Sequence, residues 1–156
     1  LAAIDGEPFE PQDPNPVGNV QIDNPEHWRY IEESMTMVVH RPYSQVFRDY
    51  GTAYEAIARA DRDMSYKMAG KSGSAQVVSI AQDILQSEDI DLSDLNKDHA
   101  LFVAYAPAQH PTIKPQIAVA VFVENGQHGS SVAGPVAKAV IDSYLLDILE
   151  IDFAAL

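Results

Sequence analysis

Two apolar runs dominate the second half of the chain. They are HALFVAYA at residues 99–106 and IAVAVFV at residues 117–123, and both stay apolar at consecutive positions. Such runs are typical of strands that are buried on both faces of a sheet. The ten residues between them include three prolines, which suits a hairpin loop better than a crossover helix. We therefore predict two neighbouring antiparallel strands.

Helical spacing precedes these runs. Asn24, Pro25 and Glu26 form a favourable helix start, because they supply a capping side chain, a proline in the first turn and an early acidic group. One apolar face follows, until Arg41-Pro42 ends the pattern, and its members are Trp28, Ile31, Met35 and Val38. A capping-box sequence, Thr-Ala-Tyr-Glu at 52–55, predicts a second and shorter helix.

The end of the chain predicts another helix. Beginning at Pro135, apolar residues recur at helical spacing, which indicates a helix lying across the sheet. These residues are Val136, Val140, Ile141, Tyr144, Leu145, Ile148 and Leu149.

The segment from Tyr66 to Val78 suits a third strand. Gly70 and Gly73 weaken it, which indicates that another group approaches the backbone closely there. After this strand the pattern allows a short helix at 80–85, followed by an acidic connection that reaches Asp98 and is expected to be solvated.

Composition limits the classes of function. A chain of 156 residues with 46% hydrophobic and 21% charged residues suits one globular domain, and no apolar run approaches the length of a membrane span. A net charge of −13 opposes binding to nucleic acid or to anionic lipid, since such binding depends on cationic side chains. With no cysteine, the chain has neither disulfides nor thiolate ligands.

Histidine spacing gives no sign of a metal site. The five histidines are scattered without the regular separations of ligand sets, and we expect surface or capping roles for them. They are His27, His40, His99, His110 and His128. His99 opens an apolar strand, so it is the one that we expect to be partly buried.

The most informative short sequence is Gly70-Lys71-Ser72. It matches the end of a phosphate-binding loop, but that motif requires glycine at position 65, which is Ser65 here. A strand is also the wrong context, because phosphate loops cradle their ligand at a strand-to-helix turn. A simpler interpretation is that the small residues allow close packing while Lys71 lies on the surface.

The surrounding sequence resembles the transpeptidase domain of the penicillin-binding proteins, in which a Lys-Thr/Ser-Gly triplet lies on a strand beside the catalytic serine. The matching segments, in order, are Gly51-Thr52-Ala53, AGKSGSAQV (69–77), HALFVAYAP (99–107), IAVAVFVENG (117–126) and Ala133-Gly134-Pro135. The chain is most similar to the C-terminal part of class B members, in particular the penicillin-binding protein 2 group of Gram-negative bacteria.

This resemblance implies an α/β fold of the α+β type, with an antiparallel sheet flanked by helices, as in penicillin-binding and serine β-lactamase-like transpeptidase domains. On this interpretation, residues 1–24 are a proline-rich acidic loop or linker and residues 151–156 are a tail. Residues 25–150 would then be the C-terminal portion of the transpeptidase domain.

The resemblance also implies roles for one strand. Ser72 and Ser74 would hydrogen-bond the terminal carboxylate of a D-alanyl stem peptide, with Gly73 leaving the backbone open between them. Lys71 would add positive potential, contact the serine of the family's second motif and help to organise proton transfer. The Ser74 amide would supply an oxyanion donor, and Ala75 and Gln76 would pair with the extended peptide.

Two family motifs are missing from this sequence. Neither Ser-x-x-Lys, which contains the nucleophile, nor Ser-x-Asn occurs in the 156 residues. Since both precede the lysine strand in this family, we expect the chain to begin after them and to be inactive alone. The function implied is that of a periplasmic peptidoglycan D,D-transpeptidase, anchored at the inner membrane by other sequence and inhibited by β-lactams.

The implied partners are the stem peptide, β-lactams, the remainder of the domain and membrane proteins of the elongation complex, with no cofactor and no nucleic acid. Two alternatives stay open. One is a noncatalytic binding or assembly module of the same fold, and the other is a fragment of a serine β-lactamase. The Ser-Ala-Gln-Val continuation at 74–77 disfavours the second.

Overall fold

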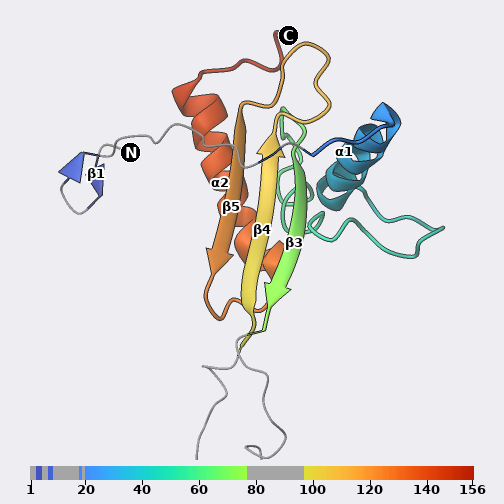
Figure 1. Ribbon diagram of the computed structural model, residues 1–156, viewed down its shortest axis with the longest axis vertical. Helices are drawn as coiled ribbons and strands as arrows, with labels where there is room; N and C mark the ends of the chain where they lie inside the picture. Colours follow the sequence, from blue (N-terminus) through green and yellow to red (C-terminus); the bar gives the residue numbers. More distant parts are fainter. Residues whose placement is uncertain (1–2, 5–6, 9–17, 19, 77–96) are drawn as a thin grey trace, which may run out of the picture.

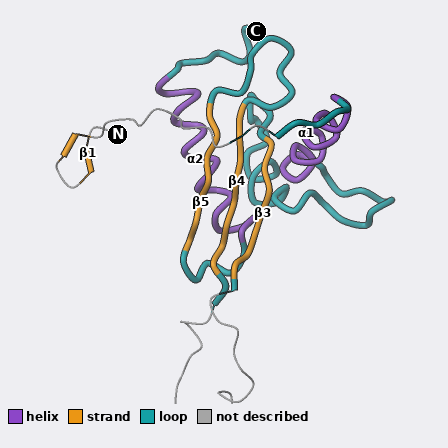
Figure 2. The backbone as a smooth tube through the Cα atoms, in the orientation of Figure 1, coloured by secondary structure: helices purple, strands orange, loops and turns teal. Residues whose placement is uncertain are grey.

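A three-stranded antiparallel sheet lies at the centre of the protein, whose structure is a computed structural model. The structure describes residues 3–4, 7–8, 18, 20–76 and 97–156. In the sheet, β4 (His99–Ala106) lies between β3 (Ala69–Ala75) and β5 (Ile117–Val123), as Figures 1 and 2 show. The two strands predicted from apolar runs are confirmed, as are their antiparallel pairing and the predicted α+β arrangement. A separate pair, β1 (Ala3–Ile4) and β2 (Glu7–Pro8), is also antiparallel.

The two faces of the central sheet are covered differently. Residues directly opposite each other on neighbouring strands point to the same face. Ser72 and Phe102 are opposite each other, and Phe102 is fully buried, so their side is the core face. Lys71 lies opposite Val103 on the other side, where Val103 is 46% exposed and the nearby Phe122 is 53% exposed. We call this second side the open face.

The C-terminal helical segment covers the core face. It consists of a π-helical turn, η2 (Gly129–Ala133), the helix α2 (Gly134–Asp142) and a second π-helical turn, η3 (Ser143–Ile148), with α2 against the sheet in Figure 1. The predicted helix across the sheet is therefore confirmed. The predicted apolar stripe is partly wrong, because Val136 and Val140 are each 47% exposed.

A different row of side chains faces the core from this segment. Its members recur every four residues and are fully buried, and they are Ala133, Ala137, Ile141 and Leu145. The small alanines allow the helix backbone to approach the sheet closely, so the bulkier valines one residue earlier turn toward solvent.

Helix α1 (Pro25–His40) lies beside β3 (Figure 1). Its predicted start is confirmed, since the Asn24 side chain accepts a hydrogen bond from the Glu26 amide at 3.0 Å. The predicted apolar face is wrong in its first half, where Trp28 is 48% exposed, whereas Val39 near the end is fully buried. Only the C-terminal half of α1 therefore packs into the core. No helix in the described residues is long and apolar enough to cross a membrane.

The short helix predicted from the capping box at 52–55 is wrong. Residues 52–60 form successive turns, and the Glu55 carboxylate binds Arg59 at 2.7 Å instead of capping the segment. A tertiary contact also holds this segment, since the Ala53 amide donates to the Val38 carbonyl of α1 at 2.9 Å. This bond fixes the segment against α1 and does not involve the amides of residues 52 and 55, which a capping box would serve.

Strand β3 is shorter than the predicted segment 66–78. It begins at Ala69, because the Met68 amide donates to the His40 side chain at 3.0 Å and not to a neighbouring strand. The predicted short helix at 80–85 and most of the acidic connection fall within residues 77–96, outside the described residues.

Gly129 brings η2 into direct contact with the sheet backbone. A Cβ atom at this position would lie 2.3 Å from the Leu101 carbonyl oxygen and 2.5 Å from the Gly73 carbonyl oxygen. Real side chains do not approach backbone atoms this closely. The start of η2 is thus pressed against β3 and β4 where these strands pair.

A polar network joins α2 to the segment that leads into β3. The Tyr66 hydroxyl donates to Asp142 at 2.6 Å, and Lys138 contacts both Asp142 and Asp61, the latter at 2.7 Å. Burial and the Asp142 carboxylate raise the pKa of Tyr66, so its hydroxyl stays protonated and keeps donating. The network joins residues 61–68, which we call the lead-in to β3, to α2 on the core face.

Replacing Asp142 with asparagine should lower the free energy of unfolding of the chain by about 1–3 kcal/mol. The reason is that Lys138, whose side chain is only 14% exposed, would lose one of its two carboxylate partners. Urea denaturation of the purified chain measures this, with the exposed Asp147→Asn as matched control. If the Asp142→Asn and wild-type curves overlay, the network does not stabilise the fold.

Gly129→Ala should lower the free energy of unfolding of the chain by at least about 1–3 kcal/mol. The new Cβ would collide with backbone atoms, which cannot move away as a flexible side chain could. Gly18→Ala is the control, since no atom lies within 4 Å of the Cβ it would add. Thermal unfolding of both variants measures the difference. An unchanged melting temperature for Gly129→Ala would contradict the packing described.

Candidate functional site

Strand β3 presents the Lys-Ser-Gly-Ser sequence at the side of the sheet. Within the described part of the chain, β3 pairs with β4 alone, so its second edge is turned away from the sheet. Lys71, Gly73 and Ser74 are exposed, and Ser72 is half-buried. The four residues singled out from the sequence therefore lie together on an accessible edge strand.

The register divides these residues between the two faces. Ser72 lies opposite Phe102 and Ser74 opposite Ala100, so both hydroxyl side chains belong to the core face. Lys71 belongs to the open face. The alternation of a strand thus puts the ammonium group on one side and the two hydroxyls on the other.

Hydrogen bonds hold two of these side chains in place. The Lys71 ammonium donates to the Ser72 carbonyl oxygen, and the Ser74 hydroxyl donates to the Gln127 carbonyl oxygen at 3.1 Å. The Ser72 hydroxyl makes no hydrogen bond to another described residue. Ser72 is therefore the hydroxyl that is free to donate to a ligand without breaking an existing bond.

The end of the strand is where the remaining predicted residues lie. Ala75 is half-buried and pairs with His99 as the last residue of β3. Gln76 follows as an exposed residue outside the strand. Both residues therefore lie at the C-terminal end of β3, directly after Ser74.

The predicted close approach at the two glycines is confirmed for Gly70. A Cβ there would lie 2.7 Å from the ring of Phe102. A Cβ on Gly73 would meet only Leu101 at 3.5 Å, an ordinary contact, and the close approach at Gly73 comes from Gly129 across its backbone.

Two of the histidines accept hydrogen bonds from backbone amides. His99 is half-buried, as expected, and accepts a hydrogen bond from the Asn125 amide at 3.0 Å. His110 accepts from the Ile113 amide at 3.1 Å. No group of three or more His, Asp or Glu residues in the described residues could hold a metal ion.

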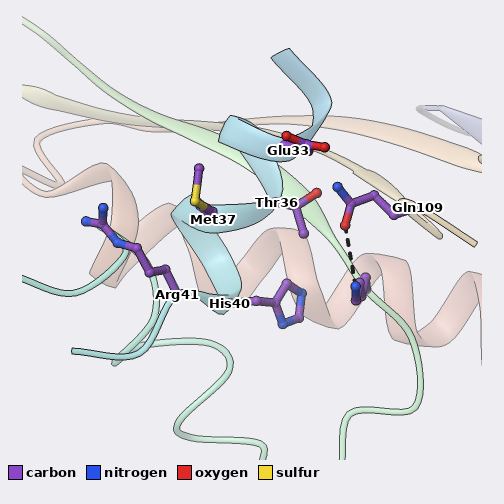
Figure 3. Close-up of a pocket in the computed structure, with 7 residues that line it drawn as sticks. Glu33, Thr36, Met37, His40, Arg41 and Gln109 are labelled. Atoms are coloured by element: carbon purple, nitrogen blue, oxygen red, sulfur yellow. Dashed lines mark hydrogen bonds between the residues drawn. The ribbon is translucent and has the colours of Figure 1, made fainter. Parts of the chain in front are cut away.

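A cavity that the sequence did not indicate lies between α1 and the lead-in to β3. Its volume is about 440 Å³. Figure 3 shows its lining side chains, which are Glu33, Thr36, Met37, His40 and Arg41 from α1, together with Lys67 and Gln109. Across it, the Lys67 ammonium donates to the Gln109 side-chain oxygen at 3.4 Å.

His40 connects this cavity to β3. Its Nε2 atom accepts the hydrogen bond from the Met68 amide at 3.0 Å, one residue before the strand begins. Burial, assisted by the positive charge of Lys67, lowers the pKa of His40, so the neutral form is favoured. Helical periodicity gave no indication of this contact, because His40 and Met68 are 28 residues apart.

Comparison with known proteins identifies the family. The model of the family described as "Penicillin binding protein transpeptidase domain" matches residues 3–142. The peptidoglycan D,D-transpeptidase MrdA of Haemophilus influenzae is 35% identical over 149 residues, covering 93% of this chain and 20% of that protein. MrdA of Escherichia coli K12 is 33% identical over 138 residues, covering 88% and 18%. MrdA of Acinetobacter baumannii is 50% identical over 88 residues, covering 56% and 12%.

These relatives are much longer than the chain, which spans only 12–20% of their length. They are Gram-negative proteins, which agrees with the resemblance drawn from the Lys-Ser-Gly-Ser-Ala-Gln sequence and its flanking segments. Since the family model matches nearly the whole chain, this chain belongs to the penicillin-binding protein transpeptidase domain family.

Proposed function

We propose that this chain forms the substrate-carboxylate side of a peptidoglycan D,D-transpeptidase, which cross-links stem peptides through an acyl-serine intermediate. The observation that carries the proposal is a Lys-Ser-Gly-Ser sequence on an accessible edge strand, in a chain of the transpeptidase family. The relatives that bear the name peptidoglycan D,D-transpeptidase support the same activity.

The terminal carboxylate of the peptide would bind at the two serines. The Ser72 hydroxyl can donate to it directly, since it makes no hydrogen bond to another described residue. The Ser74 hydroxyl would add a second bond by turning from the Gln127 carbonyl oxygen toward the ligand. Gly73, which is exposed, leaves the backbone between them accessible.

Lys71 would act from the open face. Its ammonium group would leave the Ser72 carbonyl oxygen to contact the serine of the missing second motif and to help organise proton transfer. Its positive charge would also attract the carboxylate. The Ser74 amide would supply one of two donors to the oxyanion that develops during acyl transfer, an effect worth about 2.7–4 kcal/mol when one donor is removed.

The edge of β3 would bind the rest of the peptide. An extended peptide can add to a sheet edge through main-chain hydrogen bonds, and β3 pairs on only one side in the described structure. Ala75 and Gln76 lie where such a peptide would continue beyond Ser74.

The nucleophile would come from sequence outside these 156 residues, which contain neither Ser-x-x-Lys nor Ser-x-Asn. The open face supports this proposal, because exposed Val103 and Phe122 lie on the same side as Lys71. An apolar surface of this kind is suited to packing against the remainder of the domain. That remainder would bring the reactive serine to the side on which the ammonium group lies.

The same proposal covers location, partners and domain limits. The enzyme would work on the periplasmic side of the inner membrane, with its anchor outside this chain, and would bind β-lactams and elongation-complex membrane proteins without a cofactor. Residues 25–150 would be the C-terminal portion of the domain, between a linker at 1–24 and a tail at 151–156.

The chain alone should not become covalently labelled by a fluorescent penicillin, because it lacks the nucleophile motif. A longer polypeptide that includes this chain together with both motifs should be labelled in the same gel assay. Mass spectrometry of any labelled peptide identifies the serine. A label on a serine of this chain would contradict the assignment.

In such a longer polypeptide, Ser72→Ala should lower the second-order rate of acylation by about 10–100-fold. The reason is the loss of one hydrogen bond to a charged carboxylate. Ser72→Thr keeps the hydroxyl and should restore most of the rate, and the exposed Ser143→Ala is the control. Equal rates for wild type and Ser72→Ala would remove Ser72 from the substrate site and favour a noncatalytic role for this strand.

A further inference from the structure

The start of β3 is held by a side chain from α1. The Met68 amide donates to His40 Nε2 at 3.0 Å, and the next residue, Ala69, is the first of the strand. The Met68 side chain is fully buried in the core, next to this anchored amide. On the other side of the lead-in, the Ala108 amide donates to the Lys67 carbonyl oxygen at 2.7 Å. The strand therefore enters the sheet between two fixed points.

The His40 bond is the one of the two that can be switched off. A neutral imidazole accepts at Nε2 only while Nδ1 carries the proton, and the imidazolium has no acceptor at all. Protonation would therefore leave a buried amide without its partner and place two donors face to face. Lys71 follows Met68 by only three positions, so a shift at this point is transmitted directly to the predicted site.

Burial and the positive charge of Lys67 oppose the protonation of His40 at neutral pH. Lys67 faces it from the lead-in to β3, and Arg41 and Glu33 line the same cavity from α1. Gln109, from the 107–116 connection, is uncharged. Burial is the largest effect that lowers the pKa of His40, and the positive charge of Lys67 is the second.

We propose that His40 is a positioning residue, whose neutral imidazole holds the start of β3 so that Lys71 and Ser72 lie where substrate binds. Protonation of His40 in acid releases the Met68 amide and loosens the strand. The kinetic part of this inference rests on the proposed transpeptidase function, whereas the structural part does not.

The sign of the pH effect follows from the lowered pKa. Because the folded state binds the proton on His40 less readily than the unfolded chain, the stabilisation is complete above pH about 6.5. It is lost as the pH falls through the pKa of His40 in the folded state.

Two variants separate the hydrogen bond from the titration. His40→Gln places an oxygen acceptor at the same number of bonds from Cα as Nε2, and this acceptor does not titrate. His40→Leu removes the acceptor. His27→Gln is the matched control, because His27 is an exposed histidine on the same helix.

The structural test is amide exchange of Met68 in the chain, measured by NMR and corrected for the intrinsic exchange rate at each pH. In wild type, protection of the Met68 amide should fall as the pH is lowered through the pKa of His40 in the folded state. It should be independent of pH in His40→Gln and about tenfold lower at neutral pH in His40→Leu. Acid-dependent protection that persists in His40→Gln, or full protection in His40→Leu, would overturn the proposal.

The kinetic test uses the longer polypeptide and the rate of acylation by a fluorescent penicillin between pH 5 and 8. The wild-type and His27→Gln rates should fall at the acidic end, and His40→Gln should lose the part of this fall that is due to His40. An acidic limb identical in wild type and His40→Gln would overturn the positioning role. If no variant, including wild type, is acylated while Met68 still responds to pH, the transpeptidase proposal fails and the anchoring role stands.

Discussion

The antiparallel pairing of β3 with β4 sets the position of every residue in the candidate site. It places Lys71 opposite Val103 and Ser72 opposite Phe102. Because side chains alternate between the two faces along a strand, this pairing also determines the face on which each neighbouring residue lies. A shift of the register by one residue would move the ammonium group to the core face and both hydroxyls to the open face. Phe102 prevents such a shift, because its fully buried ring is packed against the space that Gly70 leaves empty.

The sequence predicted the parts of the fold that depend on local patterns. The apolar runs gave β4 and β5 with their bounds, and Asn24 with Pro25 gave the start of α1. These features depend on runs of apolar residues and on the satisfaction of free amides at a helix start, and both effects act within a few residues. The predicted burial of β4 and β5 on both faces is wrong for the described structure, because Val103 and Phe122 on the open face are 46% and 53% exposed. The Lys-Ser-Gly-Ser sequence also appears where it was expected, on an accessible strand.

The features that the sequence did not predict are contacts between distant segments. The capping box at 52–55 predicted a helix where the structure has successive turns, and the bond from the Ala53 amide to α1 is a contact that no local pattern contains. The stripe on the last helix was partly misassigned, because two alanines of this segment are fully buried while two of the predicted valines are 47% exposed. The bond between His40 and Met68 belongs to the same class, since it joins a helix end to a strand that begins 29 residues later.

Both ends of β3 are held by elements from elsewhere in the chain, while its outer edge pairs with no other described strand. α1, which precedes β3, contributes the His40 acceptor at the start, and η2, which follows β5, contributes the backbone of Gly129 opposite Gly73. Lys71 and Ser72 lie between these two fixed points. A strand held in this way can offer main-chain groups to an extended ligand without first becoming ordered, which reduces the entropic cost of binding.

The negative charge of the chain makes this order more important, because a net charge of −13 repels a carboxylate ligand at long range. In the proposed site, attraction would then come from Lys71 and the serine hydroxyls at short range, and groups that act at short range depend on being held in position.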